Sequence, residues 1–162
     1  PLLFGGEMIK EVTFKNTTWA NLPQRLEAGT PPIAEAIGLA AAIDFIKNVG
    51  WESIIGREIQ TASYLLDALQ NIKGVTIHGS KKLEERIGVV SFSIDGVHPH
   101  DAADIMGKRH VAVRGGHHCA MPLMSVLEIP GTVRASIGMY TDTDDIDRLL
   151  DAIGVVQKVF SI

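Results

Sequence analysis

Hydrophobic residues recur at helical spacing in two long stretches of the chain. Residues 33–43 are apolar on nearly every face and follow Thr30-Pro31-Pro32, where a threonine cap and first-turn prolines are typical of a helix start. Residues 51–72 place apolar side chains three and four positions apart, which predicts a long amphipathic helix. Asn48-Val49-Gly50 separates the two. Because a helix that is apolar all round needs cover, we expect the first to be buried between layers or at a subunit contact.

Shorter stretches in the second half alternate in polarity or are rich in β-branched residues, which predicts strands at 75–77, 87–94, 111–114 and 132–137. Helices are predicted over 99–108, with Asp101 near the N-cap, and from Thr141-Asp142 onward, where acidic residues fill the first turn. The expected fold class is α/β, with an α+β small domain over 48–162: a small, mostly antiparallel sheet covered by helices. Residues 1–47 are expected to form a different unit, which begins with loops and a possible strand at 11–14.

Composition narrows the function classes. The chain has 162 residues, 46% of them hydrophobic and 21% charged, which is typical of a globular protein. Fifteen Lys and Arg against nineteen Asp and Glu argue against nucleic acid as a partner. No apolar run approaches the roughly 20 residues that span a bilayer, so we expect no membrane segment. The single cysteine excludes an intrachain disulfide framework and suits the cytoplasm. Since the chain begins Pro-Leu-Leu-Phe, without Met, we expect a piece of a longer protein.

The densest chemical cluster is Arg114-Gly115-Gly116-His117-His118-Cys119-Ala120-Met121-Pro122. Neighbouring cations and imidazoles favour the thiolate, the reactive form of cysteine, so Cys119 is a candidate nucleophile. The alternative is that Cys119 is a small buried apolar residue and that the two histidines satisfy local hydrogen bonds. A metal site is disfavoured, because three consecutive residues cannot easily point at one ion.

Three further polar positions stay open on spacing alone. His98-Pro99-His100-Asp101 fits a metal pair or, better, a helix start. Arg134, in a strand, would hold a carboxylate if it faced a cleft and would otherwise be a solvated charge. At Gly29-Thr30, exposed N–H groups and the hydroxyl could receive a phosphate, although Thr30 as a plain cap is the stronger interpretation.

Taken together, these motifs resemble the C-terminal part of a group II, SufS-type cysteine desulfurase, in the aminotransferase class V branch of the fold type I pyridoxal-phosphate enzymes. The matching motifs follow the family's order along nearly the whole chain. They are Gly5-Gly6-Glu7-Met8-Ile9, the R-x-E-A-G-T-P of 25–31, the H-P-H-D of 98–101, the R-x-G-H-H-C-A-x-P of 114–122, and 133–136. Met121 and Gly115 differ from the family's common residues.

The resemblance implies a parent enzyme that converts L-cysteine to L-alanine and leaves a persulfide on the nucleophile, Cys119. A SufE- or SufU-like acceptor protein would take this sulfur for iron-sulfur cluster assembly. The resemblance also implies that Arg134 binds the substrate carboxylate and that Arg114 lines the same pocket. Thr30 and Gly29 would reach the phosphate of pyridoxal 5'-phosphate bound by the neighbouring subunit of a homodimer, and His117 and His118 would support the cysteine loop.

The family's Schiff-base lysine, in a Ser/Gly-x-His-Lys setting upstream, has no counterpart in this sequence. We therefore expect residues 1–47 to be the end of the large cofactor-binding domain, residues 48–162 to be the C-terminal small domain, and the chain to be inactive alone. Two alternatives stay open. One is a selenocysteine lyase relative, and the other is a free-standing sulfur-carrier or partner-binding module that uses Cys119.

Overall fold

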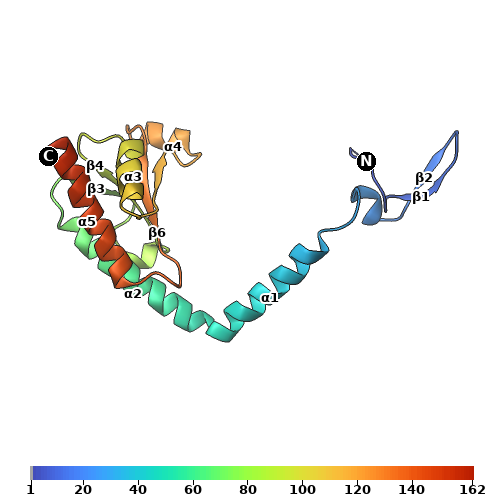
Figure 1. The fold of residues 1–162 in the computed structure, drawn as a ribbon, viewed down its shortest axis with the longest axis horizontal. Coiled ribbons are helices and arrows are strands. Elements are labelled where there is room, and N and C mark those ends of the chain that lie inside the picture. The colour runs from blue at the N-terminus through green and yellow to red at the C-terminus, as the bar shows by residue number, and fades with distance from the viewer. Residues whose placement is uncertain (1) are drawn as a thin grey trace. The chain divides into compact units, whose positions relative to one another are not determined.

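The computed structural model describes residues 2–162, so Pro1 lies outside the described residues. The chain separates into a first unit that ends at Gly50 and a second unit, Trp51–Ile162 (Figure 1). The division follows the helix break expected at 48–50, where Gly50 has φ +88°, and the predicted domain boundary at residue 47 lies three positions earlier, inside helix α1 (Ile33–Val49).

The first unit begins with an antiparallel hairpin of β1 (Ile9–Val12) and β2 (Thr17–Trp19), followed by a 3-10 turn, η1 (Gln24–Leu26). The strand expected at 11–14 ends earlier, because Thr13 Oγ1 accepts from the Asn16 N–H at 3.0 Å and turns the chain there. Met8 is fully buried beside the hairpin.

Helix α1 starts at Ile33 with Pro32 as its N-cap and no side-chain cap. The expectation that Thr30 caps this helix is wrong, because Thr30 lies two residues before the N-cap and the Ile33 N–H donates instead to the Pro31 carbonyl at 2.8 Å. No residue of α1 is buried in the single chain. Cover by a subunit contact therefore stays a prediction.

The second unit contains a four-stranded sheet that is antiparallel throughout, which confirms the predicted fold class. The strands are β3 (Val75–His78), β4 (Val89–Ile94), β5 (Arg114–Gly116) and β6 (Thr132–Ser136), in the order β3-β4-β6-β5. The helices are α2 (Trp51–Gln70), α3 (Pro99–Lys108), α4 (Met121–Val126) and α5 (Thr143–Phe160), with a 3-10 turn, η2 (Leu83–Glu85). Figure 1 shows α2, α3 and α5 against the sheet. No helix of the described residues is long and apolar enough to cross a membrane.

The core lies between the sheet and α2, α3 and α5, and strand alternation decides which side chains reach it. In β4, Val90, Phe92 and Ile94 are buried, whereas Ser91 and Ser93 point to the opposite face. Leu65 of α2 and Ile153 of α5 are fully buried in the same cluster. The face of the sheet opposite the core is therefore free to carry polar groups.

Two element boundaries differ from the prediction. β5 covers Arg114–Gly116 and not 111–114, because its pairing with β6 begins only at Arg114, while Val111 and Val113 pack on the core without a strand partner. α3 is capped by His98 and not by Asp101, because Pro99 takes the first helical position and the His98 side chain accepts from the His100 N–H at 3.3 Å.

Candidate active site

Four polar side chains form one row across the face of the sheet opposite the core. Strand register pairs His78 with Ser91, Ser91 with Arg134, and Arg134 with Arg114. Arg134 lies between Val133 and Ala135, whose side chains are buried on the core side, so its own side chain belongs to the other face. The sheet thus brings two guanidinium groups, twenty positions apart in the sequence, to paired positions on neighbouring strands.

The loop between β5 and α4 carries the thiol. Gly116, His118 and Cys119 have positive φ angles of 119°, 56° and 59°, so two consecutive non-glycine residues adopt the left-handed conformation. The Cys119 N–H donates to His117 Nδ1 at 3.1 Å, and Arg114 Nη2 lies 3.9 Å from Cys119 Sγ. Cys119 is exposed, which rules out the interpretation that it is a buried apolar residue. This is the accessible, positively flanked setting that a nucleophilic thiol needs.

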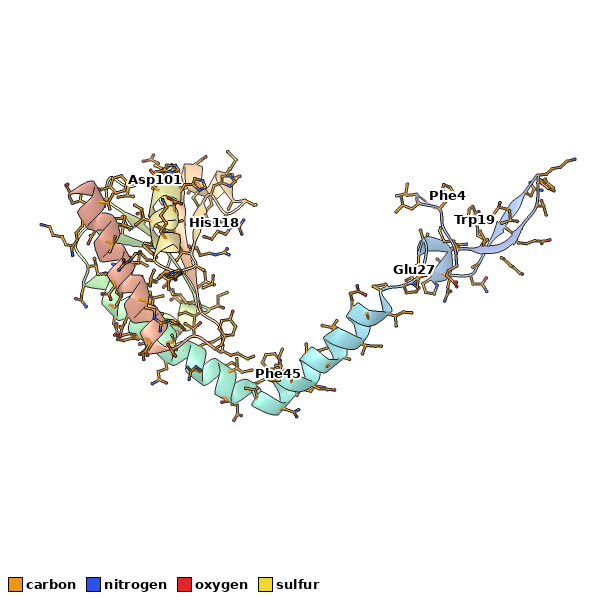
Figure 2. The ribbon with its side chains drawn as sticks, in the orientation of Figure 1. Phe4, Trp19, Glu27, Phe45, Asp101 and His118 are labelled. Atoms are coloured by element: carbon orange, nitrogen blue, oxygen red, sulfur yellow. The ribbon has the colours of Figure 1, made fainter. Side chains whose placement is uncertain are left out.

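His118 points back toward the sheet. Its Nε2 atom lies 2.9 Å from Thr132 Oγ1 and 3.1 Å from the Thr132 carbonyl oxygen (Figure 2 labels His118). Burial lowers the pKa of His118, and the charges of Arg134 and Arg114 lower it further, although the bond to the Thr132 backbone opposes them. Because a carbonyl oxygen can only accept, Nε2 carries the proton of the neutral ring and donates to Thr132.

Arg134 borders a cavity of about 330 Å³ between the sheet and α4. Its Nε atom is buried and has no hydrogen-bond partner, and among the described residues no carboxylate lies within ion-pair distance of Arg134 or Arg114. The cavity is lined by His78, Gly79, Ser91, His118, Ala120, Leu123, Met124, Leu127, Thr132 and Arg134. An unpaired guanidinium beside a mostly apolar cavity is suited to bind a carboxylate.

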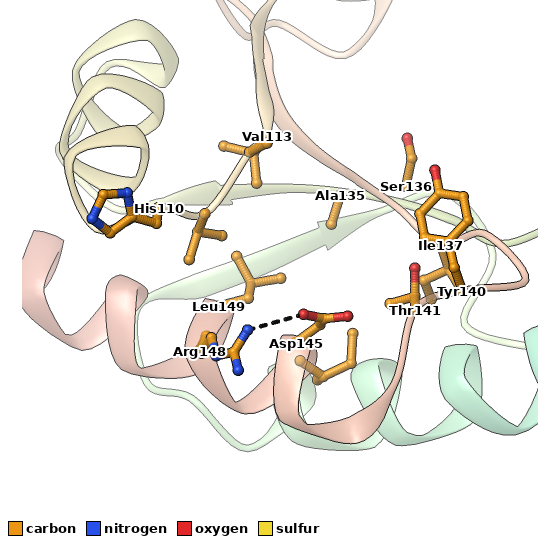
Figure 3. Close-up of a pocket in the computed structure, with 13 residues that line it drawn as sticks. His110, Val113, Ala135, Ser136, Ile137, Tyr140, Thr141, Asp145, Arg148 and Leu149 are labelled. Atoms are coloured by element: carbon orange, nitrogen blue, oxygen red, sulfur yellow. Dashed lines mark hydrogen bonds and ion pairs between the residues drawn. The ribbon is translucent and has the colours of Figure 1, made fainter.

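A second cavity, of about 270 Å³, lies near the N-terminal part of α5. Figure 3 marks the ion pair between Asp145 and Arg148 there, at 3.3 Å. Because its arginine already has a carboxylate and no thiol lines it, this cavity offers less to an anionic substrate than the cavity at Arg134.

Residues 1–149 match the family described as aminotransferase class-V. The chain belongs to the aminotransferase class-V family. It is 45% identical over 160 residues to a probable cysteine desulfurase of Halalkalibacterium halodurans and 40% identical over 161 residues to a cysteine desulfurase of Haloferax volcanii. Each match covers 99% of this chain but only 39% and 38% of the relative. The chain thus spans about two-fifths of the length of these class-V proteins.

Solved structures agree with the family and the fold. An apo cysteine desulfurase from Thermococcus onnurineus superposes with a TM-score of 0.84 at 39% identity, over 98% of this chain and 39% of that one. The cysteine desulfurase CsdA from Escherichia coli, in an S-sulfonic acid form, superposes with a TM-score of 0.81 at 31% identity, over 97% and 38%. The class-V fold predicted from the motifs is therefore confirmed.

Class-V aminotransferases use pyridoxal phosphate, and Thr30 and Gly29 are the residues of this chain that the sequence predicts at its phosphate. The exposed Thr30 hydroxyl makes no hydrogen bond within the described residues and is free to donate. Gly29 has φ +88°, and its N–H already donates to the Gly6 carbonyl at 3.0 Å, so this N–H is engaged. No lysine lines the cavity at Arg134. Of these two predicted phosphate residues, Thr30 therefore has a free side-chain donor, whereas the Gly29 N–H is already used within the chain.

The histidine pair at the start of α3 lies next to the cysteine loop, since the His100 ring lies within 3.3 Å of where a Cβ on Gly116 would stand. His98 and His100 are exposed with ring centroids 5.2 Å apart, and the described residues hold no group of three or more His, Cys, Asp or Glu that could bind a metal. Sequence reasoning missed His78, Ser91 and Thr132. Alternation along 87–94 puts Ser91 off the core face, but only the strand register shows that it neighbours Arg134.

Proposed function

We propose that this chain is the C-terminal portion of a SufS-type cysteine desulfurase and that Cys119 carries the sulfur removed from L-cysteine. The observation that carries the proposal is that the Cys119 thiol is exposed and lies 3.9 Å from Arg114. Arg114 is paired with Arg134 on the neighbouring strand, and neither arginine has a carboxylate partner among the described residues. The similarity to cysteine desulfurases over 99% of the chain supports it.

The chemistry assigned to Cys119 is a sulfur transfer. Its thiolate attacks the sulfur of L-cysteine, so that an S–S bond forms and the substrate's C–S bond breaks. The bonding electron pair stays with the substrate carbon, which takes up a proton and becomes the methyl group of L-alanine. Bound pyridoxal phosphate supplies the electron sink for this bond cleavage. The positive φ at His118 and Cys119 holds the thiol out from the sheet, where a substrate sulfur can reach it.

Arg134 is assigned to the substrate carboxylate, since its guanidinium is unpaired beside a cavity and offers two parallel donors. Arg114, 3.9 Å from Sγ, stabilises the thiolate and the terminal sulfur of the persulfide, both of which are anionic. His117 supports the loop through its bond to the Cys119 N–H.

The remaining assignments concern the two domains, the phosphate site and the acceptor of the sulfur. We assign residues 1–47 to the end of the large cofactor domain and residues 48–162 to the small domain. Thr30, with Gly29 shaping the turn before it, would contribute to the phosphate site of a neighbouring subunit in a homodimer. A SufE- or SufU-like acceptor protein in the cytoplasm would take the sulfur for iron-sulfur cluster assembly. The chain alone should be inactive toward L-cysteine, because no lysine stands in the cofactor-binding context.

Sulfur loading tests the carrier role on the chain itself. When the chain is incubated with glutathione persulfide, the outer sulfur should move to the Cys119 thiolate, glutathione thiolate should leave, and intact-mass spectrometry should show the gain of one sulfur atom. Cys119→Ser should show no gain. No gain on the unaltered chain would contradict the carrier role.

A segment exchange tests the full activity. The matching segment of the H. halodurans relative, 45% identical, is replaced by this chain, and L-alanine formation from L-cysteine is measured. We expect activity with L-cysteine, its loss in Cys119→Ser, and a KM for L-cysteine raised about tenfold or more in Arg134→Gln, since a charged hydrogen bond is worth about 1.5–3 kcal/mol. A preference for selenocysteine would favour the lyase alternative. If the protein with the exchanged segment folds and takes up sulfur on Cys119 but releases no L-alanine, the sulfur-carrier module would be favoured.

A further inference from the structure

Thr132 is a buried polar residue at the start of β6, with only 1% of its surface exposed. Neither the motifs nor the proposed function assigns it a role. Its hydroxyl and its carbonyl oxygen both lie within hydrogen-bond distance of one atom, His118 Nε2, at 2.9 and 3.1 Å. A buried threonine hydroxyl that meets a loop histidine fixes the position of that histidine, because breaking the pair would leave polar atoms buried and unsatisfied.

This contact joins the thiol loop to the strand that carries Arg134. His118 directly precedes Cys119, and Thr132 lies two positions before Arg134 on the same strand. The base of the loop is already fixed where Gly116 pairs with Thr132 in the β5–β6 ladder. The His118 bond adds a second point of attachment to the same residue, and the chain between the two attachments is only His117.

The backbone at this point needs such an attachment. His118 and Cys119 both adopt left-handed φ angles, each of which costs of order 1 kcal/mol or more for a residue other than glycine. A loop in this conformation persists only where surrounding contacts hold it. The contacts in place are the His118–Thr132 pair, the bond from the Cys119 N–H to His117 Nδ1 at 3.1 Å, and the turn bond from the Ala120 N–H to the His117 carbonyl at 2.8 Å.

We propose that Thr132 is a positioning residue, which acts through His118 to hold Cys119 Sγ beside the guanidinium group of Arg114. The inference rests on the proposed function only for the reason why the thiol is held there. The position of the thiol itself can be tested without any catalytic turnover. The test measures chemical modification of the thiol and not sulfur transfer. The positioning role can therefore be refuted while sulfur transfer is confirmed, and sulfur transfer can be refuted while the positioning role is confirmed.

The test compares two alkylating reagents of similar size, one anionic and attracted by positive charge, the other neutral. Cys119 is the only thiol, and in each reaction its sulfur forms a bond to carbon while iodide leaves. The measurement is the ratio of the rate constants for anionic iodoacetate and neutral iodoacetamide, in the 162-residue chain at low salt. The Arg114 guanidinium beside the thiol raises this ratio, and added salt lowers it by screening.

Thr132→Val keeps the branched shape that suits a buried strand and removes the hydroxyl, whereas Thr132→Ser keeps the hydroxyl. We expect Thr132→Val to lower the ratio about threefold to fivefold, the scale of one charge pair about 4 Å apart in water. Thr132→Ser should stay within about twofold of the unaltered chain. Arg114→Gln should lower the ratio when it is made in the unaltered chain. It should have little further effect when it is added to Thr132→Val, because both substitutions remove the same interaction between the Arg114 charge and the thiol.

A second pair of variants keeps the proposal testable if Thr132→Val does not fold, as judged by circular dichroism. His118→Gln retains an amide donor near the position of Nε2, and His118→Met has the same length without a donor. The ratio should be retained in the first and lowered in the second. A ratio unchanged in a folded Thr132→Val, or equal in the two His118 variants, would show that Thr132 is a packing residue only and would overturn the proposal.

Discussion

At the scale of single residues, burial has the same effect on two histidines, His78 of strand β3 and His118 of the cysteine loop. Burial lowers the pKa of His78, whose Nε2 lies 3.0 Å from Ser93 Oγ, and it also lowers the pKa of His118. In the unfolded chain both would titrate near the ordinary value of 6.5. The unfolded chain therefore binds more protons than the folded chain as the pH drops below that value.

The two histidines therefore make the folded chain less stable as the pH falls below 6.5. The stabilisation linked to these two neutral rings is fully present above pH 6.5 and is lost as the pH falls through the lowered pKa values of the folded state. The urea midpoint should therefore be lower at pH 5.5 than at pH 7.5. The double variant His78→Gln with His118→Gln, which cannot take up protons at these positions, should lose less. His110→Gln, at an exposed histidine, serves as the control and should lose as much as the unaltered chain. Equal losses in the double variant and the unaltered chain would contradict the assignment.

At the scale of secondary-structure elements, α5 has the most complete local start signal. Asp142 accepts from the Asp145 N–H at 3.0 Å, and the Asp145 side chain accepts in return from the Asp142 N–H at 3.2 Å. This capping box satisfies two of the free N–H groups in the first turn. The helix then packs Ile146, Leu149 and Ile153 on the core, so that its start and its apolar face specify the same element.

Asp142→Ala should lower the free energy of unfolding by about 1 kcal/mol, the usual cost of losing an N-cap. Asp144→Ala, in the same turn but outside the box, should cost less than half as much. Asp142→Asn should be close to the unaltered chain, since the amide oxygen can accept the same bond. Urea unfolding measures all three, and equal costs at positions 142 and 144 would show that the charge and not the cap matters.

The long helices and the core strands could be predicted from sequence because each repeats its apolar period over enough residues. α4 was missed because its six residues cover fewer than two turns, which is too short for a period to be recognised. β5 was misplaced because Val111 and Val113 are apolar and β-branched whether or not a partner strand reaches them. Local patterns specify an element's apolar face, but only tertiary pairing specifies where a short strand begins.

At the scale of the whole molecule, the motifs and the family resemblance predict the cysteine loop and a shared pocket for the two arginines, but they do not predict the strand pairing that brings these residues together. The pairing of Arg114 with Arg134 depends on the strand order β3-β4-β6-β5, which no local signal encodes. The role of Thr132 depends on a side chain that folds back from a loop. Both are non-local contacts, and local sequence patterns do not show which distant residues meet.

Helix α1 exposes apolar surface that bears on whether the isolated chain associates. Large apolar side chains on several of its faces are exposed in the single chain: Ile33, Ile37, Leu39, Ile43, Phe45 and Val49. Contiguous apolar surface of this kind favours association. We expect the isolated chain to associate with a concentration dependence measurable by light scattering.

Leu39→Glu with Ile43→Glu should shift the chain toward monomer. Lys10→Gln with Lys15→Gln, in the exposed β1–β2 hairpin, changes the net charge by the same two units and should leave the association unchanged. A chain that stays monomeric at every concentration tested would contradict the expectation.

Gly131, beside the cysteine loop, bears on how variation among relatives should be interpreted. A methyl group on Gly131 would come within 2.7 Å of the Gly116 carbonyl. Since backbone occupies the space, even alanine would push this segment away from β5. Selection should thus keep position 131 free of a side chain in lineages that have lost the sulfur chemistry but kept the fold. Invariance there would record steric exclusion, whereas divergence at position 119 would record the loss of activity.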